Sequence, residues 1–172
     1  RRIAADVRGS QIGLPEVSLG LLPGGGGVTR TVRMLGIQNA FVNVLSQGTR
    51  FNPKKAKDAG LVDELVGSAD EVVPAAKAWI KANPEAHTQP WDAKGYKMPG
   101  GNPYHPAGYM TFVGANAMVM GKTMGVYPAA RALMQAVYEG ALVPFDVALR
   151  VECRNFVNVL MNPSSSAMIR SL

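Results

Sequence analysis

The hydropathy pattern of the N-terminal third changes at a run of four glycines. Residues 1–23 alternate apolar and polar side chains, which favours short strands and turns over a helix. Residues 28–35, directly after the glycines, are expected to form a helix that Gly36 ends. The next segment ends at Gly48 and is predicted to be helical. Its apolar face consists of Ile37, Phe41, Val44 and Leu45.

Residues 52–60 carry the signals of a short helix. Asn52 is a favourable N-cap, Pro53 suits the first helical position, and Gly60 suits the position after the last turn. The apolar residues that follow, 61–66, are predicted to form a short strand. This part of the chain is therefore expected to alternate strand and helix.

Beyond residue 66 the pattern predicts a helix, a connector and further helices. Ser68 is expected to cap the first helix, which stops before Pro84. Residues 83–106 contain five prolines and no apolar periodicity, so they are predicted to connect two parts. Pro128 and Pro163 are expected to open helices. Two sets of apolar residues recur at steps of three and four, the spacing of a packed helix face: Met110, Val113, Ala117, Met120 and Met124, and Leu149, Cys153, Phe156 and Leu160.

The composition fits one compact domain, or one domain with an extension. The 172 residues are 47% hydrophobic and 17% charged, which argues against disorder, and the mean hydropathy is +0.03. No apolar run reaches the ~20 residues that a membrane span requires. The single cysteine, Cys153, allows no internal disulfide and favours a reducing compartment. Its place on an apolar helix face predicts a buried side chain rather than a nucleophile.

The net charge of +6 is confined to the first third of the chain. Residues 1–60 carry nine basic against three acidic side chains, whereas residues 61–172 carry nine of each. A basic half attracts a phosphate-bearing ligand through its long-range field. The basic residues are scattered without interleaved aromatic side chains, which argues against a nucleic-acid surface.

The glycine run, residues 24–27, matches neither common nucleotide-binding pattern. Val28 and Thr29 stand where a Walker A loop needs lysine and Ser/Thr, and the glycine spacing of the dinucleotide fingerprint is absent. Two interpretations stay open. Consecutive glycines allow close approach of a ligand to unpaired N–H groups at the start of a helix, or they form a tight turn in which nothing larger fits.

Glu16 is the other candidate for chemistry. It follows Pro15 in a mostly apolar segment, where desolvation favours the neutral acid that a proton donor needs, although a solvated loop glutamate is the plainer interpretation. His87 and His105 lie in the connector without a glutamate or cysteine at ligand spacing. No metal site or serine triad is therefore predicted.

Several motifs in fixed order resemble the crotonase (enoyl-CoA hydratase/isomerase) superfamily. They are Gly13-Leu14-Pro15-Glu16, Leu19-Gly20, Pro23-Gly24-Gly25-Gly26-Gly27, Arg30, Arg33, Leu35-Gly36 and Ala56-Lys57-Asp58-Ala59-Gly60-Leu61-Val62-Asp63. The match covers about residues 1–75. Residues 107–172 are similar, more weakly, to the helical extension of the large multifunctional fatty-acid-oxidation alpha subunits, through Tyr127-Pro128-Ala129 and the long segment after Pro144.

The resemblance implies specific roles for two residues. In this family two glutamates hold a water beside the double bond of a trans-2-enoyl-CoA, and the one in the Gly-x-Pro-Glu motif, here Glu16, protonates the alpha carbon. The backbone N–H of the first glycine after the Leu-Gly-x-x-Pro turn, here Gly24, helps to position that water or the glutamate. The partner glutamate and the oxyanion-hole glycines lie upstream of Arg1 in the family pattern. We therefore expect residues 1–172 alone to be inactive as a hydratase.

The expected fold class is α/β: the second half of a crotonase-type ββα spiral domain, followed by an α-helical linker extension. Residues 1–82 would be the C-terminal part of the hydratase domain, 83–106 the Pro/Gly-rich connector, and 107–172 the extension towards a 3-hydroxyacyl-CoA dehydrogenase domain beyond Leu172. The substrate would be a coenzyme A thioester. No cofactor is expected in this segment, no residue is assigned to cofactor binding, and NAD would belong to the dehydrogenase domain.

The partners implied are the remainder of the same polypeptide and a thiolase beta subunit. The compartment would be the bacterial cytoplasm, in preference to the mitochondrial matrix. Two alternatives remain. The first is an enoyl-CoA delta-isomerase of the same fold, which works with the Glu16 position alone. The second is a scaffold segment whose apolar faces dock neighbouring domains.

Overall fold

The computed structural model describes residues 1–171 and divides the chain into two compact units. Unit 1 consists of residues 1–13 and 50–96. Unit 2 consists of residues 14–49 together with the chain from residue 97 onward. Each unit is thus assembled from two stretches that are not consecutive in sequence. The predicted boundaries at 82/83 and 106/107 separate the hydratase part, the connector and the helical extension, and they stay a prediction.

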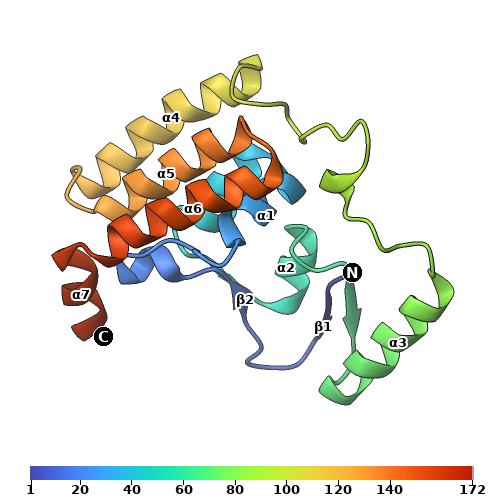
Figure 1. Ribbon diagram of the computed structural model, residues 1–172. Coiled ribbons are helices and arrows are strands. Elements are labelled where there is room, and N and C mark those ends of the chain that lie inside the picture. Colours follow the sequence, from blue (N-terminus) through green and yellow to red (C-terminus); the bar gives the residue numbers. More distant parts are fainter. Residues whose placement is uncertain (172) are drawn as a thin grey trace. The chain divides into compact units, whose positions relative to one another are not determined.

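Unit 1 contains the strands, each of them short. Strand β1 (Ile3–Ala5) pairs in parallel with β4 (Glu64–Val66), and β2 (Ile12–Gly13) pairs antiparallel with β3 (Arg50–Phe51). The strands predicted in residues 1–23 and 61–66 are therefore present (Figure 1).

The helices of unit 1 follow local sequence signals. In α2 (Pro53–Asp58) the Asn52 side chain accepts a hydrogen bond from the Lys55 N–H at 2.9 Å, as predicted. A 3₁₀ turn, η3 (Ala69–Glu71), precedes α3 (Val72–Ala82), and a second one, η4 (Pro90–Asp92), interrupts the connector. Ser68 stands at the predicted N-cap position, which here begins η3, but its side chain accepts no capping hydrogen bond. Its hydroxyl donates to the Glu71 carboxylate, which also accepts from the Gly67 N–H, so Glu71 closes this turn.

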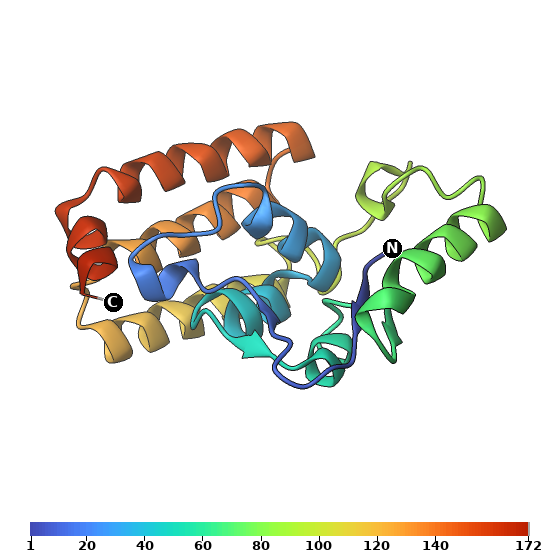
Figure 2. The same cartoon turned by 90° about the horizontal axis from the view of Figure 1, so that it is seen from below.

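Unit 2 is helical. It begins with the 3₁₀ helix η1 (Glu16–Leu19), α1 (Gly27–Leu35) and η2 (Asn39–Leu45), a π-helix. It continues with α4 (Pro106–Thr123), α5 (Pro128–Ala141), α6 (Phe145–Leu160) and α7 (Pro163–Arg170). Helices α5 and α6 form an antiparallel pair, with α1 packed against both (Figures 1 and 2). Among the described residues, no helix is long and apolar enough to cross a bilayer.

The core of unit 2 joins sequence-distant helices. Val28 and Val32 of α1, Phe41 and Leu45 of η2, and Leu133 of α5 are all at most 3% exposed. Each fully buried side chain of this size contributes about 1.5–3 kcal/mol. The predicted apolar face of residues 37–45 is therefore a core face. The π-helical winding of η2 was not predicted from its spacing.

On two helices, the residues that are buried differ from those predicted. The predicted methionine face of α4 is open to solvent: Met110, Val113, Met120 and Met124 are 46–80% exposed, whereas Ala115 and Val119 are buried. On α6 the buried face is displaced by one residue from the predicted one and consists of Ala148, Glu152, Asn155 and Val159. Leu149 and Phe156 are half-buried, and Cys153 and Leu160 are exposed, so Cys153 is not the buried residue expected.

Candidate functional site

Glu16 is the first residue of η1, directly after Pro15. The short helix is closed by Gly20, whose φ of 74° allows the chain to turn back, and the Leu21 N–H donates to the Glu16 carbonyl at 3.0 Å. The Glu16 side chain is half-buried rather than immersed in bulk water. Its Oε2 atom is shielded from solvent and has no hydrogen-bond partner among the described residues. A buried polar atom is normally paired, so this oxygen is an unsatisfied acceptor among the described residues.

Gly24 lies in the turn that leads into α1, packed against a side chain from α6. A Cβ built on Gly24 would stand 2.3 Å from Cγ of Phe156, which leaves no room for a side chain. Gly25, next to it, is exposed, and a Cβ there would meet nothing within 4 Å. No group in residues 1–171 accepts a hydrogen bond from the Gly24 N–H. The turn therefore combines a sterically fixed backbone with an unpaired donor.

A residue that the sequence analysis missed, Glu152 of α6, holds the other end of this turn. Its Oε1 accepts from the Gly26 N–H at 2.5 Å, and its Oε2 accepts from both the N–H and the hydroxyl of Thr29 at 2.7 Å. Glu152 is 1% exposed, and Thr29 is 6% exposed. A buried carboxylate is stabilised by such donors and by the positive end of the helix dipole.

The contacts of Glu152 bear on both interpretations of the glycine run. Of the N–H groups at the start of the following helix, those of Gly26 and Thr29 are paired with Glu152, whereas those of Gly27 and Val28 have no acceptor among the described residues. The carboxylate of this chain thus occupies the place where an anionic ligand would bind a helix N-terminus. Among the described residues, the N–H groups of Gly24, Gly25, Gly27 and Val28 have no acceptor, and Gly24 is the one to which the family resemblance assigns a role.

One signal in the sequence points to Glu152. Helix α1 begins with Gly26 as its N-cap, which has no side chain to accept a hydrogen bond, and with Thr29 where a capping box has Glu or Gln. Such a helix needs an acceptor from elsewhere if its start is buried. Glu152 is a lone acid between Val151 and Cys153 in a mostly apolar stretch. The sequence analysis gave it no role.

The arginines of α1 are engaged with the protein. Arg33 donates to the carbonyls of Gly140 and Val143 at 3.1 and 2.5 Å, at the end of α5. The Arg30 guanidinium lies 5.6 Å from the ring centroid of Phe145 and donates to the Gly25 carbonyl at 3.2 Å. Because both arginines are engaged within the protein, these contacts give no reason to assign either one to the phosphates of a ligand.

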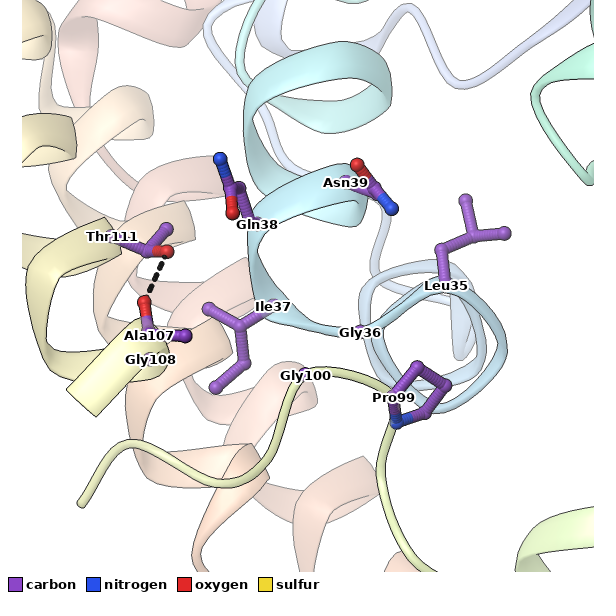
Figure 3. Close-up of a pocket in the computed structure, with 10 residues that line it drawn as sticks. All are labelled: Leu35, Gly36, Ile37, Gln38, Asn39, Pro99, Gly100, Ala107, Gly108 and Thr111. Atoms are coloured by element: carbon purple, nitrogen blue, oxygen red, sulfur yellow. Dashed lines mark hydrogen bonds between the residues drawn. The ribbon is translucent and has the colours of Figure 1, made fainter. Parts of the chain in front are cut away.

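Two cavities of unit 2 are lined by residues other than Glu16 and Gly24. One cavity lies between residues 35–39, the Pro99–Gly100 turn and the start of α4, where Thr111 donates to the Ala107 carbonyl at 2.8 Å (Figure 3). A wider aromatic hollow is lined by residues of α4 and by Tyr138. Within residues 1–171, no three His, Cys, Asp or Glu side chains are grouped to hold a metal. His105 instead caps α4.

Comparison with known proteins identifies the family. A family model described as enoyl-CoA hydratase/isomerase matches residues 2–91, just over half of the chain. The chain is 33% identical over 171 residues to a fatty acid oxidation complex subunit alpha from Shewanella amazonensis, and 33% identical over 178 aligned positions to the subunit of the same name from Shewanella frigidimarina. These alignments cover 98% and 99% of the chain but 23% of each relative. The chain thus spans about a quarter of their length.

A solved structure shares the fold. The crystal structure of carnitinyl-CoA hydratase from Mycobacterium avium matches with a TM-score of 0.52 at 21% identity, over 95% of this chain and 48% of that one. The observed α/β arrangement, with few strands and a helical C-terminal part, agrees with the predicted partial crotonase domain followed by helices. The chain belongs to the enoyl-CoA hydratase/isomerase family.

Proposed function

We propose that this chain supplies the Glu16-bearing half of a site that hydrates trans-2-enoyl-CoA to 3-hydroxyacyl-CoA. One observation carries the proposal: the unpaired, solvent-shielded Oε2 of Glu16 in a segment where the family pattern has an acid. The free N–H of Gly24 supports it, because a fixed backbone donor can hold a water or a carboxyl group in place.

In the proposed reaction, Glu16 gives its proton to the alpha carbon of the thioester. The oxygen of a bound water forms a bond to the beta carbon and keeps one proton as the product hydroxyl, while its other proton passes to the partner glutamate that the family pattern places upstream of Arg1. That proton returns to Glu16 before the next turnover. The alpha–beta double bond becomes a single bond, and one water is added. The charge that develops on the thioester oxygen requires backbone N–H donors, which the same pattern also places upstream. We therefore propose that residues 1–172 alone do not catalyse hydration.

We further propose that the intact protein is an alpha subunit of a fatty-acid-oxidation complex. Support comes from the two relatives of that name, which align with nearly the whole chain. In this proposal the rest of the polypeptide carries an NAD-dependent 3-hydroxyacyl-CoA dehydrogenase domain, a thiolase beta subunit is the partner, and the compartment is the bacterial cytoplasm rather than the mitochondrial matrix. The proposed domain division is 1–82, 83–106 and 107–172.

The test is the substitution Glu16→Gln in the intact protein, with crotonyl-CoA as substrate. We expect turnover to fall by far more than tenfold, because the amide keeps the size of the side chain but cannot donate the proton. A loss below tenfold, about 1.4 kcal/mol of barrier, would show that Glu16 is not the acid. Glu85→Gln, the same chemical change at an exposed residue of the connector, is the matched control.

The delta-isomerase alternative is decided with the same preparation. An isomerase moves one proton along the acyl chain and adds no water, so it converts a 3-enoyl-CoA to the 2-enoyl isomer. Turnover of the 3-enoyl substrate that exceeds hydration of the 2-enoyl substrate would favour it. Hydration that exceeds isomerisation supports the hydratase.

The exposed methionine face of α4 favours one further candidate, the scaffold. Met110, Met120 and Met124 are 63%, 46% and 80% exposed, an unusual position for so many large apolar side chains on one helix. If Glu16→Gln leaves turnover intact while Met120→Glu disrupts assembly of the intact protein, docking is the function of this segment.

A further inference from the structure

The α6 helix contacts the glycine turn at two points one helical turn apart. Glu152 accepts from Gly26 and Thr29, and the ring of Phe156, four residues later, abuts Gly24. Residues four apart lie on the same side of a helix. One face of α6 therefore spans the turn from Gly24 to the first turn of α1.

The two oxygens of Glu152 reproduce a capping box with one carboxylate from another helix. In a capping box, one side chain accepts from the N–H of the fourth position and a second reaches back to the N–H of the cap residue. Here Oε2 serves the fourth position, Thr29, and Oε1 serves the cap, Gly26. With both ends tied, the orientation of the peptides between them is set by α6.

This arrangement also determines which donors remain for a ligand. The Gly26 and Thr29 N–H groups are used inside the protein, whereas the Gly24 N–H is unpaired among the described residues. Gly26 has a φ of 90°, a conformation that glycine adopts easily and leaves easily. Gly26 lies two residues after Gly24, so its bond to the buried Glu152 carboxylate restrains the turn that carries the Gly24 N–H.

We propose that Glu152 is a positioning residue of the hydratase site: it fixes the glycine turn so that the Gly24 N–H is presented to the reacting water or to the carboxyl group of Glu16. This inference rests on the proposed function and extends it to α6, which lies outside the residues matched by the family model. The helical extension is then part of the active-site architecture as well as a connection to further domains.

The test is Glu152→Gln in the intact protein. The glutamine side chain replaces one acceptor by an NH₂ donor, so at least one of the Gly26 and Thr29 bonds is lost while the shape is kept. We expect kcat for crotonyl-CoA hydration to fall at least tenfold, with KM changed less than threefold. Asn155→Ala is the matched control: Asn155 is also buried on α6, but its side chain donates to the Val151 carbonyl within its own helix.

A second readout follows the turn directly. We expect amide hydrogen exchange at Gly26 to rise at least tenfold in Glu152→Gln and to stay unchanged at Leu133. If Glu152→Gln does not fold, Glu152→Asp replaces it, because it keeps both acceptors but withdraws them by one methylene. For that variant we expect a kcat loss of at least threefold together with faster Gly26 exchange.

The results separate this inference from the function on which it rests. Unchanged kcat in a folded Glu152 variant, or an equal loss in Asn155→Ala, overturns the positioning role even when Glu16→Gln is inactive. If Glu16→Gln stays active, the hydratase proposal fails together with the catalytic consequence drawn here. Gly26 exchange that matches the parent protein overturns the structural part in either case.

Discussion

Two adjacent glycines in the turn before α1 provide a sharp test of its packing. Neither Gly24 nor Gly25 has a positive φ, so alanine is compatible with the backbone at both. They differ in their surroundings. A Cβ at position 24 would lie 2.3, 2.5 and 2.8 Å from three atoms of Phe156, whereas a Cβ at position 25 has nothing within 4 Å. Any difference in stability between Gly24→Ala and Gly25→Ala therefore reports the contact with Phe156.

The size of the effect follows from these distances. Carbon atoms in contact are normally about 3.5–4.0 Å apart, so the Phe156 ring must move by more than about 1 Å. Forcing an extra methyl group into a packed region costs about 1–3 kcal/mol. Gly25→Ala is expected to be neutral, or more stable by about 0.4–1 kcal/mol because alanine restricts the unfolded chain. For a chain of this length, 2 kcal/mol corresponds to roughly 4–8 °C in Tm.

Urea unfolding of the chain, followed by circular dichroism at 222 nm, measures this difference. The helical signal comes largely from unit 2, whereas Trp79 and Trp91 lie in unit 1, so their fluorescence monitors the other unit. In a double-mutant cycle, Phe156→Ala removes the two ring atoms nearest to the new methyl group but keeps the Phe156 Cβ at 2.8 Å, so it relieves most of the clash. Gly24→Ala should therefore cost less stability in the Phe156→Ala background than in the parent chain, with a coupling of about 1 kcal/mol or more. Equal stability of the two alanine variants, or an additive cycle, would refute the contact.

Three further predictions concern other parts of the chain. A hydrogen-bonded ion pair with Arg2 holds the pKa of Asp63 below its ordinary value of 3.8, so its contribution to stability is present above that pH and is lost as the pH falls through the lower folded value. Asp63→Asn should therefore reduce the urea midpoint more at pH 6 than at a pH below 3.8, and an equal reduction at both would contradict this origin. Cys153 should react with Ellman's reagent in the native chain as fast as in urea, whereas protection would contradict its exposure. Val159→Ala should lower the free energy of unfolding by about 2 kcal/mol, and Leu160→Ala should lower it by less than about 1 kcal/mol. The reverse order would show that Leu160, and not Val159, lies on the buried face of α6.

Local signals were enough to predict the elements whose stabilising contacts lie within a few residues. Helix α2 is an example: the Asn52 side chain caps it three residues away, and Pro53 has the φ that a first helical residue needs. The glycine that ends α1 and the proline that opens α5 were located in the same way. At the start of α3, local reasoning chose the wrong acceptor, because Ser68 and Glu71 are both able to close that turn.

The faces of α4 and α6 were not predictable from periodicity, for a physical reason. Spacing shows which residues share a side of a helix but not whether this chain covers that side, and the Met120 side of α4 is uncovered. On α6, the inward position of Glu152 is decided by donors more than 120 residues away in sequence. Of the candidate site, the sequence motifs located Glu16 and Gly24, whose roles stay predictions, whereas the carboxylate that holds the turn required the structure.

The way unit 2 is assembled also bears on its synthesis. Thr29 and Glu152 are 123 residues apart, and the α5 and α6 helices that cover α1 lie in the last third of the chain. At translation rates of about 5–20 residues per second, α1 leaves the ribosome roughly 6–25 s before its partners do. During that interval Val28 and Val32 have no tertiary cover from them, so the nascent chain exposes the apolar face of an amphipathic helix. The hydrogen bonds from Gly26 and Thr29 to Glu152 therefore form only after α6 has been synthesised.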